Sequence, residues 1–243
     1  MTTSRISGNY FAHRTYVKSD AATGLLSTRQ GNRLLAVPEV LLRSIHQALR
    51  AETGQAAPLA LYTCGFWWGG SFYDRVRSEV ESYYNTTIAQ MNAVEFLVMM
   101  RQVWAVHGFG SLTLDFSHRE HGFIQVTTEN SAMALGSELG VEEGQLPSHH
   151  LEAGFIAAWF SRWAGKNLRA CATDLGVSSG MNTEPNAKRN QFLVGLASQI
   201  EQAETWVKQG ISSTEILQRF AAESNHKLTS TKVGKKATSH RII

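Results

Sequence analysis

The chain has 243 residues, which is enough for one large domain with a substantial buried core. Its composition, with 43% hydrophobic and 18% charged residues, is that of an ordinary globular protein. The formal net charge is +3, but the basic excess comes from residues that follow Glu223, the last acidic residue. We therefore expect a slightly acidic body and no basic surface of the kind that binds nucleic acid.

The cysteines and the apolar runs indicate the cellular compartment in which the protein is expected to act. Cys64 and Cys171 cannot form a disulfide framework or a cysteine-based zinc site by themselves, so a reducing, cytoplasmic setting is the simplest inference. The N-terminus shows no apolar leader, and runs such as 153–160 are far shorter than the ~20 residues that span a bilayer. We expect contact with a membrane to be peripheral at most.

The two ends of the chain lack the periodicity of regular elements. Residues 1–33 mix glycine, serine, threonine and aromatic residues, which favours an extended or partly stranded lead-in. Residues 225–243 are polar and basic, a composition typical of disordered tails. A single domain is therefore expected over residues 34–224.

Three helices are predicted in the first half of this domain. The first opens at Pro38, which suits a first turn, and ends at Gly54. Residues 59–84 and 87–105 form two longer amphipathic helices, which we expect to pack as a pair, with an N-cap supplied by residues 85–87. The buried face of the first helix is expected to consist of five residues at helical spacing: Val40, Leu41, Ile45, Ala48 and Leu49.

The pattern then changes from helical to alternating. Apolar and polar residues alternate over 111–116 and again over 124–127, which predicts a β-hairpin with one buried face. Residues 147–164 are apolar around most of a helix, so this helix should be central. A strand at 168–175, a long helix at 187–208 and a short helix at 213–222 follow. This order predicts an α+β fold, an antiparallel sheet of about four strands packed against a layer of long helices.

The sequence contains no complete catalytic motif. Residues 176–180 match the G-x-S-x-G pattern of a nucleophile elbow around Ser178, but polar residues with Pro185 follow where the elbow needs a helix. No P-loop or dinucleotide fingerprint occurs, and the histidines lack the spacing of a metal site. We therefore predict neither catalytic residues nor a metal centre.

Four stretches in chain order resemble the 4-vinyl reductase domain, a family named from a bacteriochlorophyll-biosynthesis protein. They are 59–72, 108–114 continued by 122–132, 149–157 and 167–176. The fold of this family is related to ligand-binding domains of Golgi transport-particle subunits and of nitric-oxide signalling. Gly65, Gly69 and Gly154 match its close-packing glycines, which let a backbone or a flat ligand approach a helix. The resemblance covers about residues 9–207, and it departs from the family at Ser179, near which many relatives have a second cysteine.

The resemblance implies a binder of a hydrophobic or tetrapyrrole-like molecule, such as chlorophyll, a chlorophyll precursor or a bilin. Such a protein would assist pigment synthesis, pigment delivery or photosystem assembly in a phototroph such as a cyanobacterium, at the thylakoid surface at most peripherally. The named reductase activity is not expected, because the chain has no dinucleotide motif. The alternative is a ligand-free scaffold that docks on photosystem subunits through an aromatic surface, as a homodimer or as a heterodimer with a related domain.

The candidate ligand-binding residues are aromatic side chains on two helices and three histidines at element boundaries. The aromatic residues would line a cleft or fill the core, and the adjacent Trp67 and Trp68 cannot both face the same interior. A histidine would serve as the axial ligand of a metal tetrapyrrole or cap a helix. The candidates are Trp67, Trp68, Phe72, Tyr73, Phe155, Trp159, Trp163, His149, His150 and His107.

Overall fold

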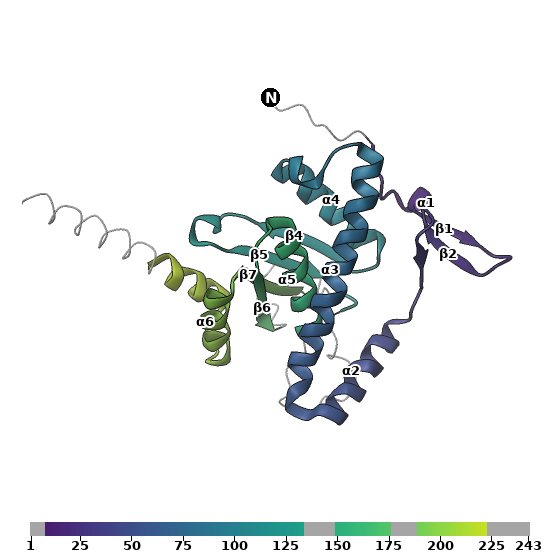
Figure 1. Cartoon of the computed structure of the whole chain (residues 1–243). Helices are drawn as coiled ribbons and strands as arrows, with labels where there is room; N and C mark the ends of the chain where they lie inside the picture. The colour runs from purple at the N-terminus through teal and green to yellow at the C-terminus, as the bar shows by residue number, and fades with distance from the viewer. Residues whose placement is uncertain (1–7, 134–148, 176–188, 223–243) are drawn as a thin grey trace, which may run out of the picture.

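The computed structural model describes residues 8–133, 149–175 and 189–222 (Figure 1). The predicted tail at 225–243, the loop and helix start at 140–148 and the turn at Ser178 lie outside the described residues. The strands are β1 (Val17–Asp20), β2 (Leu25–Thr28), β3 (Arg33–Leu34), β4 (Ser111–Asp115), β5 (Ile124–Glu129), β6 (Leu168–Leu175) and β7 (Arg189–Leu196). The helices are α1 (His13–Tyr16), α2 (Glu39–Thr53), α3 (Ala57–Tyr84), α4 (Ala93–Val106), α5 (His150–Ala164) and α6 (Ala197–Lys208), followed by a helix over 213–222.

The main sheet has the strand order β4-β5-β7-β6, and each neighbouring pair is antiparallel. The expected hairpin is its β4–β5 edge, where Leu112 pairs with Thr128 and Leu114 with Val126. The lead-in forms a separate sheet of three short antiparallel strands, β1-β2-β3. The predicted α+β class and the antiparallel sheet are confirmed.

Helices cover both faces of the main sheet. Because side chains alternate along a strand, Phe192 and Val194 of β7 face α5, while Leu193 faces the other way. The second face is covered by α6 and the 213–222 helix, which bury Cys171 with Leu193. Helix α5 is buried from Leu151 to Phe160 and packs against α3 on one side and the sheet on the other (Figure 1). Its central position is as predicted.

Glycines bring α3 and α5 into backbone contact. A Cβ added at Gly65 would overlap the Leu151 carbonyl oxygen, and one added at Gly154 would overlap the Tyr62 carbonyl oxygen. Gly69 lies in the same way against Phe155. The predicted pairing of α3 with the following helix is wrong, because this glycine face of α3 packs along α5 instead. Helix α4 packs on β4.

The helix predicted over 187–208 is wrong in its first half. Residues 189–196 form β7, an inner strand of the sheet, and the helix begins only at Ala197. Phe192, Leu193 and Val194 are all buried because both sheet faces are covered. A strand buried on both faces reads as a continuous apolar run, which periodicity cannot tell from a buried helix.

Two other helix details also differ from expectation. In α2, the predicted face is wrong at Val40, Leu41, Ile45 and Ala48, which are exposed, and right at Leu49, which contacts the body together with Leu42. The helix turns Leu42 and Leu49 inward because it packs beside Leu61 and Leu151.

Helix α4 begins later than predicted. The Asn92 side chain accepts the Val94 and Glu95 N–H groups at 3.0 and 2.9 Å, while Thr87 caps a short 3-10 turn.

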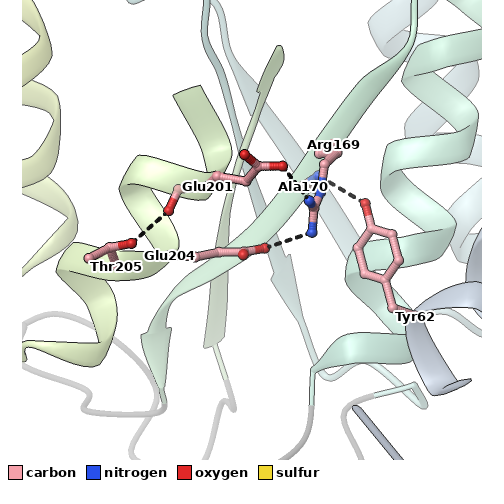
Figure 2. A network of polar contacts seen from close by, with 6 residues as sticks. All are labelled: Tyr62, Arg169, Ala170, Glu201, Glu204 and Thr205. Atoms are coloured by element: carbon pink, nitrogen blue, oxygen red, sulfur yellow. Dashed lines mark hydrogen bonds and ion pairs between the residues drawn. The ribbon is translucent and has the colours of Figure 1, made fainter. Parts of the chain in front are cut away.

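An arginine on the edge strand β6 ties three elements together (Figure 2). The Arg169 guanidinium donates to Glu201 and Glu204 of α6 at 3.0 and 3.3 Å. It also lies over the ring of Tyr62 from α3, 5.7 Å from the ring centroid, and the Tyr62 hydroxyl accepts the Ala170 N–H at 3.3 Å. This arrangement fixes α6 and α3 to the same end of the sheet. None of the helices among residues 8–133, 149–175 and 189–222 combines the length and the apolar character of a membrane span.

A buried carboxylate joins the lead-in to the domain. Glu79 of α3 accepts hydrogen bonds from the hydroxyls of Tyr10 and Tyr16, both at 3.1 Å. It also accepts from Thr28 at 3.2 Å and from the Asn32 amide at 2.6 Å. All four donors come from the first 33 residues, and the Glu79 side chain is fully buried. A buried carboxyl group that accepts from four donors anchors the lead-in to the core.

Candidate functional site: a buried polar cluster beside an aromatic core

The interior between α3, α4 and α5 is filled by aromatic rings. Phe72, Trp104, Phe109, Phe155 and Trp159 form this aromatic cluster, and each is at most 9% exposed. The Trp104 ring centroid lies 5.4 Å from that of Phe155 and 5.8 Å from that of Trp159. The indole N–H groups of Trp104 and Trp159 are buried and have no acceptor among the described residues. The cluster therefore offers two unused donors inside an apolar environment.

The predicted aromatic residues divide into three groups. Phe72, Phe155 and Trp159 belong to the aromatic cluster, and Tyr73 and Trp68 contact it. Trp163 lies further along α5, where it stacks on Phe96 with 4.2 Å between ring centroids. Trp67 is 76% exposed and points away from the interior. The adjacent tryptophans thus face opposite environments, and Trp67 is the one that meets solvent.

His107, at the end of α4, is held in one tautomer by its neighbours. Its Nδ1 lies 2.8 Å from the Val103 carbonyl oxygen and therefore carries the proton, which leaves Nε2 as an acceptor. Nε2 lies 3.3 Å from the Arg75 guanidinium and 3.2 Å from the Tyr16 hydroxyl. Burial lowers the pKa of His107 to about 4, so the ring is neutral. Both ring nitrogens are engaged within the protein.

A second group of polar side chains lies between the start of α5 and the sheet. Glu152 and His149 come from α5 and its N-cap, and Thr128 and Asn190 come from β5 and β7. Thr128 and Asn190 are register partners, so their side chains stand side by side on the face that also carries Val126 and Phe192. We call Glu152, His149, Thr128 and Asn190 the Glu152 cluster.

The Glu152 cluster is closed to solvent and short of hydrogen bonds. Glu152 and Thr128 are 0% exposed, Asn190 3% and His149 4%. Six of their polar atoms have no partner among the described residues: both Glu152 carboxylate oxygens, both His149 ring nitrogens, Thr128 Oγ1 and Asn190 Nδ2. Buried polar groups in proteins are nearly always paired, and an unpaired one costs about 1–3 kcal/mol.

Burial also sets the charges in this cluster. It raises the pKa of Glu152 to about 7, against a smaller lowering by the nearby Ser131, Thr128 and Asn190 side chains. These three side chains lie near the carboxyl, but none makes a hydrogen bond of good geometry to its oxygens. Burial lowers the pKa of His149 to about 4, with a further lowering by His150. At neutral pH the imidazole is neutral and the carboxyl is close to its midpoint.

The other predicted polar candidates are less suited to a site. His150 is exposed, and among the described residues no group of three histidine, cysteine, aspartate or glutamate side chains could hold a metal. Cys171 is buried, and burial raises its thiol pKa to about 12, so it is not a thiolate. Of the three candidate histidines, His149 is the one with two buried and unpartnered ring nitrogens in this part of the structure.

Sequence reasoning missed Glu152, Thr128 and Asn190, although each leaves a signal. Glu152 is the lone acidic residue in a helix that is otherwise apolar from Leu151 to Phe160. Thr128 continues the inward-facing alternation of a strand as a polar residue. Asn190 lies in a strand that the apolar pattern predicts as a helix, so its direction toward the interior does not follow from the sequence. A carboxylate in an apolar helix was the most accessible of the three signals.

The fold has a counterpart among solved structures. The phenol-responsive sensory domain of the transcription activator PoxR, in a crystal structure with phenol, matches with a TM-score of 0.57 at 15% sequence identity. The match covers 79% of this chain and 90% of that one. The two chains share a fold. No family model matches the chain, and no curated protein matches it by sequence.

Two further structures match at lower TM-scores. One is a vinyl-4-reductase family protein from Methanocaldococcus jannaschii, at 14% identity, with a TM-score of 0.38 over 66% of this chain and 82% of that one. The other is a trafficking protein particle complex subunit 3 from Naegleria fowleri, covalently bound to palmitic acid, at 7% identity, with a TM-score of 0.41 over 65% of this chain and 96% of that one. The resemblance to the 4-vinyl reductase family stays a prediction from the sequence.

Proposed function

We propose that this chain is a small-molecule-binding domain of the sensory kind, whose ligand lies between α5 and the main sheet. The observation that carries the proposal is the Glu152 cluster, in which six buried polar atoms lack partners in the described parts of the chain. An apolar interior with a few convergent polar groups is the usual construction of a ligand site. The phenol-responsive sensory domain of like fold supports a ligand of modest size.

The residues around the cluster supply the apolar part of such a site. On α5, Ile156 and Trp159 follow Glu152 at intervals that keep them on one face of the helix, and both are fully buried. Val126 and Phe192 continue the inward sheet face beside Thr128 and Asn190. Trp159 also carries a buried N–H donor without a partner among the described residues. A compact aromatic molecule with one polar group matches this combination.

A tetrapyrrole is the ligand that the family resemblance predicts, and His149 would then be the axial ligand. Its two buried, unpartnered nitrogens support that role among the three histidines. A role in pigment delivery or photosystem assembly rests on this second proposal alone. An absorbance spectrum of the protein purified from a phototrophic host tests it. Bound pigment lost in His149→Ala but kept in His150→Ala would support it, and a colourless protein would contradict it.

Ligand binding itself is tested with the purified full chain and a panel of small molecules. We would measure thermal stabilisation and titration calorimetry with phenol, catechol, indole, toluene and octanoate. A ligand at a hundred times its Kd stabilises a protein by about 2.7 kcal/mol. We expect at least one aromatic compound to bind with a stoichiometry of one. Absence of binding across the whole panel would contradict the proposal.

Two tryptophans make a matched pair for placing the ligand. Trp159→Phe alters the buried face beside the Glu152 cluster, whereas Trp67→Phe alters a side chain that is 76% exposed. We expect the first substitution to weaken binding at least about fivefold and the second to leave it unchanged. Equal effects of the two substitutions would place the ligand elsewhere.

A further inference from the structure

We propose that Glu152 is the acceptor that selects ligands carrying a hydroxyl or amino group over ligands of the same shape without one. This inference rests on the proposed function, because it specifies the chemistry of the same site. An ionised carboxylate only accepts hydrogen bonds, so the matching group on a ligand must donate. Both Glu152 oxygens are buried and have no hydrogen-bond partner in the described ranges, so both can accept from a ligand donor.

The neighbours of Glu152 favour a group that both donates and accepts. The Asn190 amide has an unpartnered N–H donor at Nδ2, and the Thr128 hydroxyl is also unpartnered within the described structure. These two stand opposite each other in the β5–β7 register, under the helix that carries Glu152. A ligand hydroxyl can donate to the carboxylate while it accepts from Asn190 or Thr128. An ether oxygen can satisfy only the second requirement.

The same cluster disfavours anions. A ligand carboxylate would place a second negative charge beside the Glu152 carboxyl in a buried site, where like charges repel strongly. His149 is neutral at physiological pH, and no lysine or arginine belongs to the cluster. The chemical class that fits is a neutral aromatic alcohol, phenol or amine. The apolar side chains of Ile156, Val126 and Phe192 would contact its ring.

Four compounds that share one ring separate these requirements. Phenol carries a donor and an acceptor, anisole an acceptor only, toluene neither, and benzoate a charge. For the wild-type full chain we expect phenol to bind about tenfold or more tightly than anisole and toluene, the factor that one hydrogen bond to a charged acceptor gives. Benzoate should bind most weakly. Binding would be measured by titration calorimetry at pH 8, where Glu152 is mainly ionised.

Substitutions then assign the preference to Glu152. In Glu152→Met the acceptor is replaced by an apolar side chain of similar length, and we expect phenol and toluene to bind within about threefold of each other. Thr128→Val should reduce the preference for phenol, and Thr127→Val, at the adjacent strand position facing the other way, should not. Unchanged toluene binding in each variant shows that the site remains folded.

The outcomes separate this inference from the proposed function. Equal binding of phenol, anisole and toluene by the wild type would overturn the role of Glu152 while leaving small-molecule binding intact. A phenol preference that persists in Glu152→Met would overturn it as well. Binding of none of the four compounds would overturn the proposed function for this ligand class and the inference with it.

Discussion

Gly65 of α3 lies so close to Leu151 of α5 that a methyl group at position 65 would overlap the Leu151 carbonyl oxygen. The obstacle is backbone, which cannot rotate away as a side chain can. We expect Gly65→Ala to destabilise the protein by about 3 kcal/mol, as overpacking in a rigid core does. Urea unfolding followed by circular dichroism measures the change.

The control for this prediction is on the same helix. Gly70 is also buried, but a Cβ there would lie 3.7 Å from the Arg162 side chain, an ordinary contact distance. Gly70→Ala should therefore be neutral or stabilising by up to about 1 kcal/mol, because alanine favours a helix more than glycine does. Equal costs at positions 65 and 70 would mean that α3 and α5 are not in backbone contact.

Glu79 provides the second prediction, which concerns how the lead-in is held. Glu79→Ala removes the acceptor for Tyr10, Tyr16, Thr28 and Asn32 and leaves buried hydroxyls unpaired. We expect a loss of about 3 kcal/mol and faster amide exchange across residues 10–34. Hydrogen exchange with mass spectrometry locates the effect. Glu52→Ala, an exposed site on α2, is the control and should leave exchange in the lead-in unchanged.

The sequence was most informative where the hydrophobic pattern fits one kind of secondary structure only. The β4–β5 hairpin and helix α5 are predicted nearly to the residue. Strict alternation of apolar and polar residues matches a strand only, and the long segment that is apolar around its circumference matches a central helix only. Strand β7 failed because Phe192, Leu193 and Val194 are buried on both sides. The wrong α2 stripe shows a related limit, since Leu41 and Leu42 are equally apolar and only tertiary packing decides which is covered.

The candidate site was harder to predict than the fold because it is assembled across the chain. Asn190 lies beside Thr128 only because of the register between β5 and β7. Local sequence does not determine the register between strands that are distant in the chain. The tethering of Tyr10 to Glu79 likewise joins residues 69 positions apart. Aromatic residues were recognisable as a group, but the sequence alone could not separate Trp67 on the surface from Trp159 in the core.

The two cysteines give a third prediction, which concerns access to the second sheet face. Cys64 is exposed on α3, whereas Cys171 is buried beneath α6 and burial raises its pKa. A thiol-reactive probe at pH 8 should therefore label Cys64 rapidly and Cys171 only as the protein unfolds. Peptide mapping after timed labelling distinguishes them, and Cys64→Ser provides a protein with Cys171 as its single thiol. Rapid labelling of Cys171 in that variant would contradict the packing of α6 on the sheet.

The buried carboxyl of Glu152 gives a pH dependence with a definite sign. Its pKa is about 7 in the folded protein, raised from 4.5 mainly by burial. A group with a raised folded pKa contributes stability that is fully present below about pH 4.5 and is lost as pH rises through about 7. At about 1.4 kcal/mol per pKa unit, the loss approaches about 3 kcal/mol at high pH. Glu152→Gln has no such group, so its stability relative to the wild type should rise between pH 5 and 8.

The measurement is the difference in unfolding free energy between Glu152→Gln and wild type, taken from urea unfolding at a series of pH values. His149 acts in the opposite sense, because its lowered pKa contributes stability above about pH 6.5 that is lost as pH falls through about 4. This contribution is common to both proteins and cancels in the difference. A difference that does not change with pH would mean that the Glu152 carboxyl is solvated or paired in the folded protein, and the argument for a ligand donor at this position would fail with it.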